Sequence, residues 1–328
     1  MFPTGLSMLW ESADPREALR ERFSLDDFDD AVAWMSKGLA EAWGINVETC
    51  DRIIISDTNA IAWVGTDRGA LIAKWSRAQD QFERLEAIAD LLKALHDQGM
   101  PVAPPLASLS ANQLEDKRLD GRHRLILHSG QTPLSMTVQP QIDGELLDIT
   151  DEAVVRQAGA CLATLHNALA DHADPRLADP KPTDDLGQQI QTWLEREDAG
   201  RAPDASARLR DQIASLPPID RETQFIHRDY RSSNILTAGS EVLAIIDFDG
   251  VVTGYCINDL AFAFVYIGTR FRSWAPTPAY VREALLDGYQ SVRPLTQLEH
   301  KWLQAVVLWY GIGAIPPGDD PAGWAAAI

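Results

Sequence analysis

The amino-acid sequence predicts an α+β fold of two lobes, in which a small N-terminal lobe built on an antiparallel sheet precedes a larger, mainly helical C-terminal lobe. Short apolar runs separated by turn residues occupy residues 51–75 and return at 124–139, a pattern typical of neighbouring antiparallel strands. From residue 142 onward the apolar residues recur mostly at helical spacing, and a chain of 328 residues can bury two cores. We therefore expect an N-terminal helical segment over 1–44, the sheet lobe over 45–141 and the helical lobe over 142–328.

Composition limits the class of protein. Hydrophobic residues make up 45% of the chain and charged residues 23%, as in ordinary globular proteins. The net charge of −19 repels phosphate backbones, so we expect no nucleic-acid partner. Cys50, Cys161 and Cys256 are isolated, which argues against a disulfide framework or a zinc site. Residues 1–17 lack the pattern of a signal peptide and no apolar run is long enough to span a membrane, so we expect a cytoplasmic protein without a membrane partner.

The N-terminal segment contains one clear helix signal. Residues 24–44 begin with the N-cap candidate Ser24, carry acids early, place apolar residues at helical spacing and stop at Gly44. This pattern predicts an amphipathic helix that packs on the following strands. We assign it no chemistry.

Three strands are predicted next, over Ile53–Ile55, Ile61–Val64 and Ala70–Trp75. Lys74 falls inside the third strand, among apolar residues, where an ammonium group is costly to bury unless an anion meets it. The functional interpretation is therefore a lysine that pairs with a bound anion. The alternative is an edge-strand lysine whose ammonium group extends into water.

A helix over 79–98 follows, because its apolar residues form one stripe. Glu86 lies nearer the buried edge of this stripe than Glu83, so it is the better candidate to accompany Lys74. A solvated helical acid is the alternative. Further strands are predicted over 124–127 and 136–139. The sequence then changes from strand-like to helical patterns, and we place the lobe boundary at this change.

The C-terminal lobe opens with a helix over Asp151–Ala170, and His166 beside its apolar stripe is expected to be a hydrogen-bonded core residue. Residues 171–220 predict a pair of helices with loops. Asn258-Asp259-Leu260-Ala261 opens another apolar helix, where Asp259 can both cap the helix and brace the loop that contains Asp229. Aromatic residues of the last third predict core packing, with a cation-binding aromatic site as the alternative.

The segment Phe225–Gly250 holds the residues best suited to chemistry. Two short apolar runs flank the turn Thr237–Glu241 and predict a β-hairpin, and Asp229, Asn234 and Asp247 stand at the ends of its strands. Burying a lone carboxylate is costly, so these side chains need a partner. One amide and two carboxylates form an oxygen-only set that suits Mg²⁺ better than zinc.

The spacing of these residues matches one kind of catalytic loop. His227-Arg228-Asp229 followed by Asn234 fits the H-R-D-x-x-x-x-N pattern of kinases, and Asp247-Phe248 stands where the metal-binding Asp-Phe pair of a kinase follows. In this interpretation Asp229 accepts the proton of an attacking hydroxyl, while Asn234 and Asp247 hold Mg²⁺ against the phosphates of a nucleotide. The alternative is a structural hairpin with an incidental His-Arg-Asp.

The same interpretation assigns residues of the N-terminal lobe to the nucleotide, which we expect to be ATP, with GTP as the alternative. Lys74 is predicted to pair with the phosphates and Glu86 with Lys74. Asn59 lies in the loop between the first two strands, which lacks the G-x-G-x-x-G of protein kinases but offers side-chain donors. The backbone from Gln139 to Gln141 is where an adenine edge is expected to bind.

Taken together, these motifs resemble the aminoglycoside phosphotransferase and choline/homoserine kinase superfamily, which comprises small-molecule kinases with a protein-kinase-like fold. The similarity covers residues 45–315. Besides the segments above, it includes Gly99–Pro105 (G-x-P-V-x-x-P), Gly159–His166 (G-x-x-L-A-x-L-H), Asp259-Leu260-Ala261, and Gly288-Tyr289 with Pro294-Leu295. The last pair of motifs is most similar to the homoserine-kinase-like branch.

The resemblance implies an ATP- and Mg²⁺-dependent phosphotransferase that phosphorylates a hydroxyl of a small molecule. An aminoglycoside, an amino alcohol or a sugar metabolite is the expected acceptor, with cationic compounds among the candidates. Two alternatives stay open. Arg228, where many relatives carry Gly, is typical of protein kinases, and the missing Gly-rich loop fits a non-catalytic nucleotide-binding pseudokinase. Asp249 adds a further carboxylate beside Asp247, either as a metal ligand through water or as a turn cap.

Overall fold

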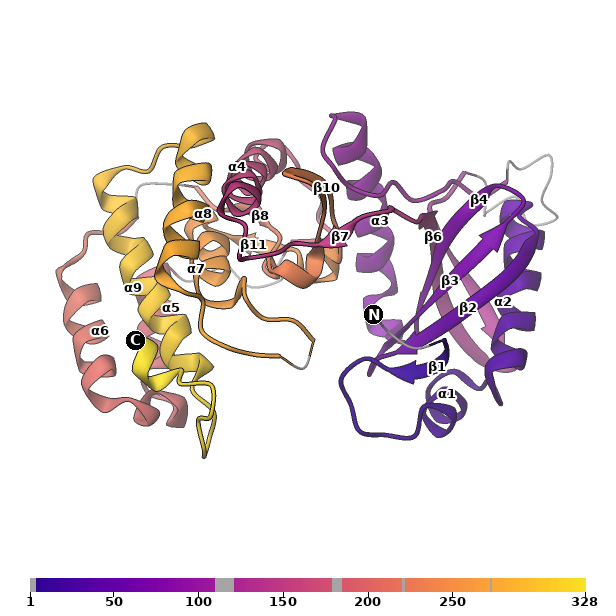
Figure 1. The fold of residues 1–328 in the computed structure, drawn as a ribbon, viewed down its shortest axis with the longest axis horizontal. Coiled ribbons are helices and arrows are strands. Elements are labelled where there is room, and N and C mark those ends of the chain that lie inside the picture. The colour runs from indigo at the N-terminus through magenta and orange to yellow at the C-terminus, as the bar shows by residue number, and fades with distance from the viewer. Residues whose placement is uncertain (1–3, 110–120, 179–184, 220–221, 272) are drawn as a thin grey trace. The chain divides into compact units, whose positions relative to one another are not determined.

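The structure is a computed structural model that describes residues 4–109, 121–178, 185–219, 222–271 and 273–328 (Figure 1). The chain divides into two compact units, Met1–Asp143 and Gly144–Ile328. Each unit buries hydrophobic residues of its own. The first unit is organised around one sheet, and the second is mainly helical.

Within its described residues, the first unit contains a six-stranded sheet of order β1-β2-β3-β4-β6-β5. Its strands are β1 (Gly5–Met8), β2 (Val47–Ile55), β3 (Asn59–Thr66), β4 (Gly69–Ser76), β5 (Arg124–Ser129) and β6 (Thr132–Pro140). Neighbouring strands are antiparallel except β1, which runs parallel to β2 with Met8 opposite Ile55. The strands predicted from periodicity are confirmed, whereas β1 was not predicted.

One face of this sheet packs on two helices, α1 (Pro15–Phe23) and α2 (Phe28–Trp43), the second of which lies alongside the strands in Figure 1. The predicted position of the helix start, Ser24, is wrong, because the second helix begins at Phe28. Ser24 takes a left-handed backbone conformation with φ 57° and ends α1 instead. The second helix begins after its N-cap, Asp27, and ends at Gly44 as predicted.

The helix after β4 begins with the 3-10 turn η1 (Gln79–Gln81) and continues as α3 (Phe82–Asp97). Leu85, Ile88 and Leu95 of the predicted stripe are buried. The chain then turns at Gly99, whose φ of 84° favours glycine. This helix carries Glu86, so the structure places that residue on the element expected for it.

The second unit is built mainly from helices, which are α4 (Glu152–Leu169), α5 (Leu186–Trp193), α6 (Pro203–Ser215), α7 (Cys256–Tyr266), α8 (Ala279–Val292) and α9 (Gln297–Ala314). Short strands accompany them, namely β7 (Glu145–Leu146), β8 (Gln224–Ile226), β9 (Ile235–Ala238), β10 (Glu241–Ile245) and β11 (Val252–Gly254). Short 3-10 turns complete the unit, namely η3 (Glu197–Arg201), η4 (Ser232–Asn234), η5 (Phe248–Gly250) and η6 (Ala325–Ala327). The α+β prediction is confirmed, as is the helix pair within 171–220.

Two glycines allow α4 and α8 to approach at backbone distance. A Cβ atom on Gly159 would lie 2.1 Å from the carbonyl oxygen of Leu285, and one on Gly288 would lie 1.8 Å from that of Arg156. No side chain fits at these separations, so the close packing of α4 against α8 explains why glycine occupies both positions. The crossing brings His166 of α4 to Tyr289 of α8, where the ring nitrogen Nδ1 lies 2.9 Å from the phenol oxygen.

The predicted hairpin is formed by β9 and β10, with Ile235 opposite Ile245. Just beyond this pair, the N–H of Ile246 donates to the carbonyl of Asn234 over 2.9 Å. Asn234 and Asp247 therefore lie at the same end of the hairpin. The loop that leads from β8 to this end contains Asp229.

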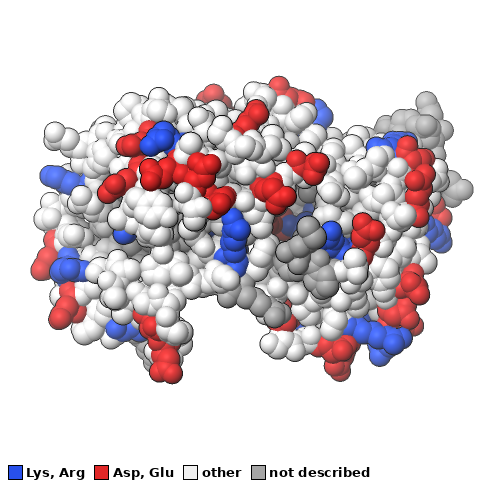
Figure 2. Space-filling model, in the orientation of Figure 1, with Lys and Arg blue, Asp and Glu red and all other residues white. Residues whose placement is uncertain are grey.

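The described surface reflects the acidic composition. Figure 2 shows acidic side chains spread over the drawn face, while the basic ones form small separate groups. None of the helices in the described part of the chain has the length and apolar character that crossing a membrane requires.

Candidate active site

Asp229 is held by a bidentate ion pair within the loop between β8 and β9. Its Oδ1 lies 2.9 Å from Nε of Arg231, and its Oδ2 accepts from Nη2 of the same guanidinium over 2.9 Å. Asn234 Nδ2 donates to the same Oδ2 over 2.8 Å and to the backbone carbonyl of Asp229 over 2.9 Å. The Asp229 side chain is 24% exposed, so a small molecule can reach a carboxylate whose orientation is fixed.

Burial raises the pKa of the Asp229 carboxyl above its ordinary value. The guanidinium of Arg231 acts in the opposite direction, and the negative charge of Asp247 adds to the increase. A carboxylate that is partly desolvated in this way is a stronger base than one in water. The position of Asp229 therefore suits a group that receives a proton.

His227 ties this loop to the end of β10. Its Nε2 lies 3.2 Å from the carbonyl oxygen of Ile246, and its Nδ1 accepts the N–H of Asp229 over 3.2 Å. These contacts place the ring proton on Nε2. The imidazole also meets the ring of Phe248 edge to face, with centroids 4.6 Å apart. The buried His227 thus joins the loop that contains Asp229 to the segment that leads into Asp247.

Asp259 braces the same loop from α7. Its Oδ2 accepts the backbone N–H of His227 over 2.6 Å, and its Oδ1 accepts that of Arg228 over 2.5 Å. His166 Nε2 lies 3.1 Å from the same Oδ2, and both side chains are fully buried. The predicted bracing role of Asp259 is confirmed. Its predicted capping role falls instead to Asn258, whose Oδ1 accepts the N–H of Tyr255 at the beginning of α7.

The neighbours of His166 extend this brace. Burial alone lowers the pKa of a histidine, but Tyr289, Cys256 and the carboxylate of Asp259 raise the pKa of His166 well above its usual value. These neighbours favour the protonated form of His166 beside the carboxylate of Asp259. The prediction of a hydrogen-bonded core histidine is confirmed.

The backbone at Arg228 is unusual for a large residue. Its φ of 66° lies in the left-handed region that glycine enters readily, while its side chain is exposed. The hydrogen bond from its N–H to Asp259 holds this conformation. The conformation gives a physical reason for glycine at this position of the motif in other proteins.

Asn234 and Asp247 offer oxygen ligands at the end of the hairpin. Nδ2 of Asn234 donates to Asp229, and its Oδ1 accepts from the hydroxyl of Ser233 over 3.4 Å. An amide oxygen has two lone pairs, so Oδ1 can still accept from a cation. Asp247 is exposed and takes a left-handed conformation with φ 65°. No group of three or more His, Cys, Asp or Glu that could hold a metal occurs among the described residues. The amide oxygen of Asn234 and the carboxylate of Asp247 nevertheless fit Mg²⁺, because this ion usually binds one or two carboxylates together with water and phosphate oxygens.

In the first unit, Lys74 lies on β4 opposite Ile61 of β3 and Thr137 of β6. Its neighbours Ala73 and Trp75 are buried toward α1 and α2, so Lys74 projects from the other face of the sheet. Asn59 begins β3, and its carbonyl accepts the N–H of Ser56 over 2.8 Å. Lys74 lies within a strand as predicted, whereas Asn59, which was expected in the loop before the second strand, is the first residue of β3.

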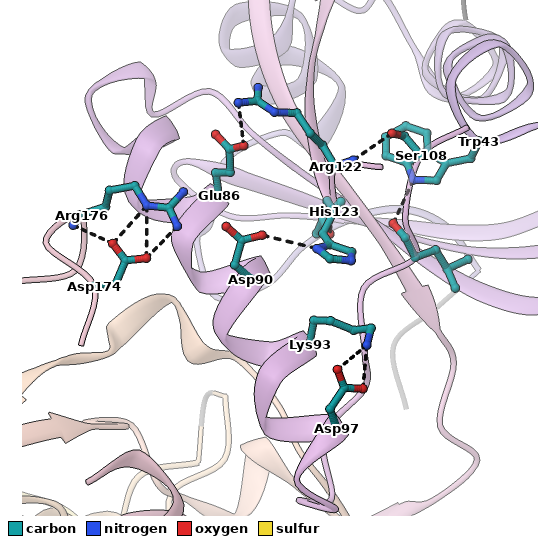
Figure 3. A network of polar contacts seen from close by, with 12 residues as sticks. Trp43, Glu86, Asp90, Lys93, Asp97, Ser108, Arg122, His123, Asp174 and Arg176 are labelled. Carbon is teal, nitrogen blue, oxygen red and sulfur yellow. Dashed lines mark hydrogen bonds and ion pairs between the residues drawn. The ribbon is translucent and has the colours of Figure 1, made fainter. Parts of the chain in front are cut away.

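The remaining nucleotide candidates have partners within the first unit. A carboxylate oxygen of Glu86 lies 3.1 Å from the guanidinium of Arg122, as Figure 3 shows. Gln139 stands opposite Ile72 in the ladder between β4 and β6. The N–H of Gln141 donates to the carbonyl of Ala70 over 3.0 Å.

Two residues near Asp229 were not predicted. Arg231 occupies a position that the H-R-D-x-x-x-x-N pattern leaves undefined, and its guanidinium carbon lies 5.7 Å from the ring centre of Trp274. Trp274 follows α7 in a loop and is one of the aromatic residues of the last third, for which core packing was predicted with a cation-binding aromatic site as the alternative. Its 50% exposure contradicts core packing for this residue. No local sequence signal joins the two residues.

The sequence pattern described as "Phosphotransferase enzyme family" matches residues 55–295 of the chain. A homoserine kinase of Pseudomonas aeruginosa (strain LESB58) is 26% identical over 225 residues, a match that covers 64% of this chain. That match spans 61% of the length of the homoserine kinase.

Solved structures share the fold. An amicoumacin kinase in complex with AMP-PNP, Ca²⁺ and Ami aligns with a TM-score of 0.60 and 16% identity, covering 94% of this chain and 92% of that one. A microcompartment-associated aminopropanol kinase aligns with a TM-score of 0.59 and 18% identity, covering 90% of this chain and 93% of that one.

Proposed function

Because the chain belongs to the phosphotransferase enzyme family, we propose that it transfers a phosphoryl group from Mg²⁺-bound ATP to a hydroxyl of a small molecule. The observation that carries this proposal is the arrangement of Asp229. Its carboxylate is fixed by Arg231 and Asn234, and its backbone is joined through His227 to the strand that precedes Asp247.

Phosphoryl transfer depends on positioning and charge neutralisation more than on covalent chemistry. Asp229 orients the acceptor hydroxyl and receives its proton. Asn234 and Asp247 would hold Mg²⁺, which would neutralise phosphate charge. Lys74 contributes a positive charge from the first unit. A loose transition state releases the proton late, so an ordinary carboxylate suffices as the base.

The names of the relatives suggest acceptors that carry both a hydroxyl and an amino group. The relatives and related structures include homoserine kinases and an aminopropanol kinase. We include hydroxy amino acids, amino alcohols and aminoglycosides as acceptor candidates, and ATP is preferred over GTP because adenine nucleotides accompany the related structures.

The test is coupled ADP release with Mg-ATP across a panel of hydroxyl compounds, comparing the unchanged chain with Asp229→Asn. Loss of a general base lowers kcat by about 10²–10⁴-fold, while ATP binding should persist. The control is Asp171→Asn, an exposed carboxylate on the same unit, which should leave turnover unchanged. Unchanged kcat in Asp229→Asn contradicts the role of Asp229.

Two other results would redirect the proposal. Phosphate incorporation into protein in place of small molecules indicates a protein kinase, the alternative suggested by Arg228. Tight Mg-ATP binding without turnover of any acceptor indicates a pseudokinase. Failure to bind any nucleotide contradicts the kinase assignment itself.

A further inference from the structure

We infer that Arg231 and Trp274 form an acceptor subsite that selects hydroxyl compounds carrying a carboxylate, in preference to polycationic ones. This inference rests on the proposed function, because the subsite is defined by its contact with Asp229. It names the chemical class of the acceptor, which no pattern in the sequence encodes.

The first observation is the charge beside the base. Arg231 donates one hydrogen bond to Asp229, from Nη2, while its Nε lies 2.9 Å from Oδ1 in the ion pair and is buried without a hydrogen bond of its own. These two nitrogens account for two of the five N–H donors that a guanidinium offers. The planar guanidinium therefore retains donors for a second anion, and a carboxylate matches their spacing. The Arg231 side chain is 20% exposed, enough for a small ligand to reach it.

The second observation is the position of Trp274. Its indole is 50% exposed, yet its Nε1–H donates to the carbonyl of Phe271 over 2.7 Å and its ring meets that of Tyr266 at 6.1 Å. The indole is thus held in place while one side stays open to solvent. Its cation partner is Arg231 of the same chain, 5.7 Å away. An aromatic surface that already holds a guanidinium does not favour a ligand cation at the same place.

The charges around Asp229 support the same conclusion. Arg228, which directly precedes Asp229 in the chain, adds a second exposed cation. Asp259 is buried and committed to backbone N–H groups, so it offers a ligand no negative charge. The negative charge of Asp247 acts on Asp229, and the proposed function assigns that carboxylate to Mg²⁺. An ammonium group placed beside Arg231 meets like charge, whereas a carboxylate placed there meets N–H donors.

The test uses pairs of acceptors that differ only by a carboxylate. L-Homoserine is paired with 3-amino-1-propanol, and L-threonine with 1-amino-2-propanol. The ratio of kcat/KM within each pair is measured by ADP release, for the unchanged chain and for Arg231→Gln. Any effect of Arg231 on Asp229 cancels in this ratio, because both members of a pair use the same base.

We expect at least one carboxylated acceptor to be preferred, and Arg231→Gln to reduce the preference by about 10- to 100-fold, as removal of a hydrogen bond to a charged group does. Trp274→Ala should reduce it by a smaller factor, because the guanidinium loses its support. Trp10→Ala is the matched control, since Trp10 is 49% exposed on the first unit and should leave the ratio unchanged.

Binding is measured separately by calorimetry, in the presence of AMP-PNP, so that the inference is tested even without turnover. If no carboxylated probe binds, or if the preference is the same in Arg231→Gln, the subsite is wrong. If Arg231→Gln raises the KM for ATP but leaves the kcat/KM ratio within each acceptor pair unchanged, the guanidinium binds phosphate. That result also contradicts the proposed subsite. Carboxylate-dependent binding with no Asp229-dependent turnover instead contradicts the proposed function and leaves the subsite intact.

Discussion

The loop around Asp229 and the sheet that carries Lys74 hold their polar residues in different ways. In the loop, the candidate residues bond to one another: Asn234 to Asp229, the backbone N–H of Asp229 to His227, and His227 to the strand before Asp247. In the first unit the candidates lie on separate strands and on α3, and Glu86 pairs with Arg122. A site built within one short segment is fixed locally, whereas a site shared among elements depends on their packing.

The largest expected effect follows from the brace beneath the loop. Asp259→Ala leaves the backbone N–H groups of His227 and Arg228, and the buried imidazole of His166, without their acceptor. Removing one partner of a buried charged network costs about 3–5 kcal/mol, so we expect a loss of unfolding free energy of this size and a collapse of kcat. Urea unfolding and ADP release measure the two quantities.

Asp174→Asn is the control for that variant. Asp174 forms an ion pair with Arg176 on the same unit, and both side chains are partly exposed, so its loss should cost about 0–1 kcal/mol. Equal stability of Asp259→Ala and Asp174→Asn would show that the loop does not depend on the buried brace.

The second effect concerns the helix crossing that brings His166 to Tyr289. Gly288→Ala places a Cβ atom 1.8 Å from the carbonyl oxygen of Arg156, so α8 must move away from α4. Overpacking of this kind costs about 1–3 kcal/mol in unfolding free energy. Thermal or urea unfolding detects it, and kcat should fall because Tyr289 supports the brace.

Gly313→Ala is the control, because the same substitution there adds a Cβ atom that the surrounding residues can accommodate. Gly313 lies near the end of α9 and is exposed, and a Cβ atom there would lie 3.9 Å from the ring of Trp193, an ordinary contact distance. Alanine should gain up to about 1 kcal/mol of helix stability at this position. A similar loss in both variants would mean that the close approach of α4 and α8 is not what requires Gly288.

The difference between the two regions also explains what the sequence could predict. Asp229, Asn234 and Asp247 lie within one segment, so their spacing alone indicated that they come together. The strands were readable because alternate residues of β3 and β4 are buried. Such patterns are local consequences of a strand with one covered face.

The features that were missed depend on residues far apart in the chain. Strand β1 has four residues and pairs with β2, so no local pattern announces it. Trp274 lies far from Arg231 in sequence, and their contact is set by the loop after α7. The partner of Glu86 follows a segment, 110–120, outside the described residues. Spacing within a motif carries no information on such contacts.

The third effect separates Lys74 from Glu86. If Lys74 pairs with nucleotide phosphates, Lys74→Met should raise the KM for ATP by about 10- to 100-fold through loss of a charged contact. Glu86 is paired with Arg122, and the exposures of the two side chains are 24% and 49%. Glu86→Gln should therefore change that KM by less than about fivefold. An effect as large as that of Lys74→Met would instead show that Glu86 serves the lysine.

The smallest effect is on the pH dependence of turnover. Asp229 must be ionised to receive a proton, so kcat/KM should fall as the pH decreases through its pKa. Because burial raises that pKa, the acid limb should lie above about pH 3.9, the ordinary value for aspartate. Arg231 opposes the increase, so Arg231→Gln should move the limb to higher pH still. A limb that moves to lower pH in this variant would mean that the guanidinium does not stabilise the ionised carboxylate, and the loop would then owe its order to Asp259 and His227 alone.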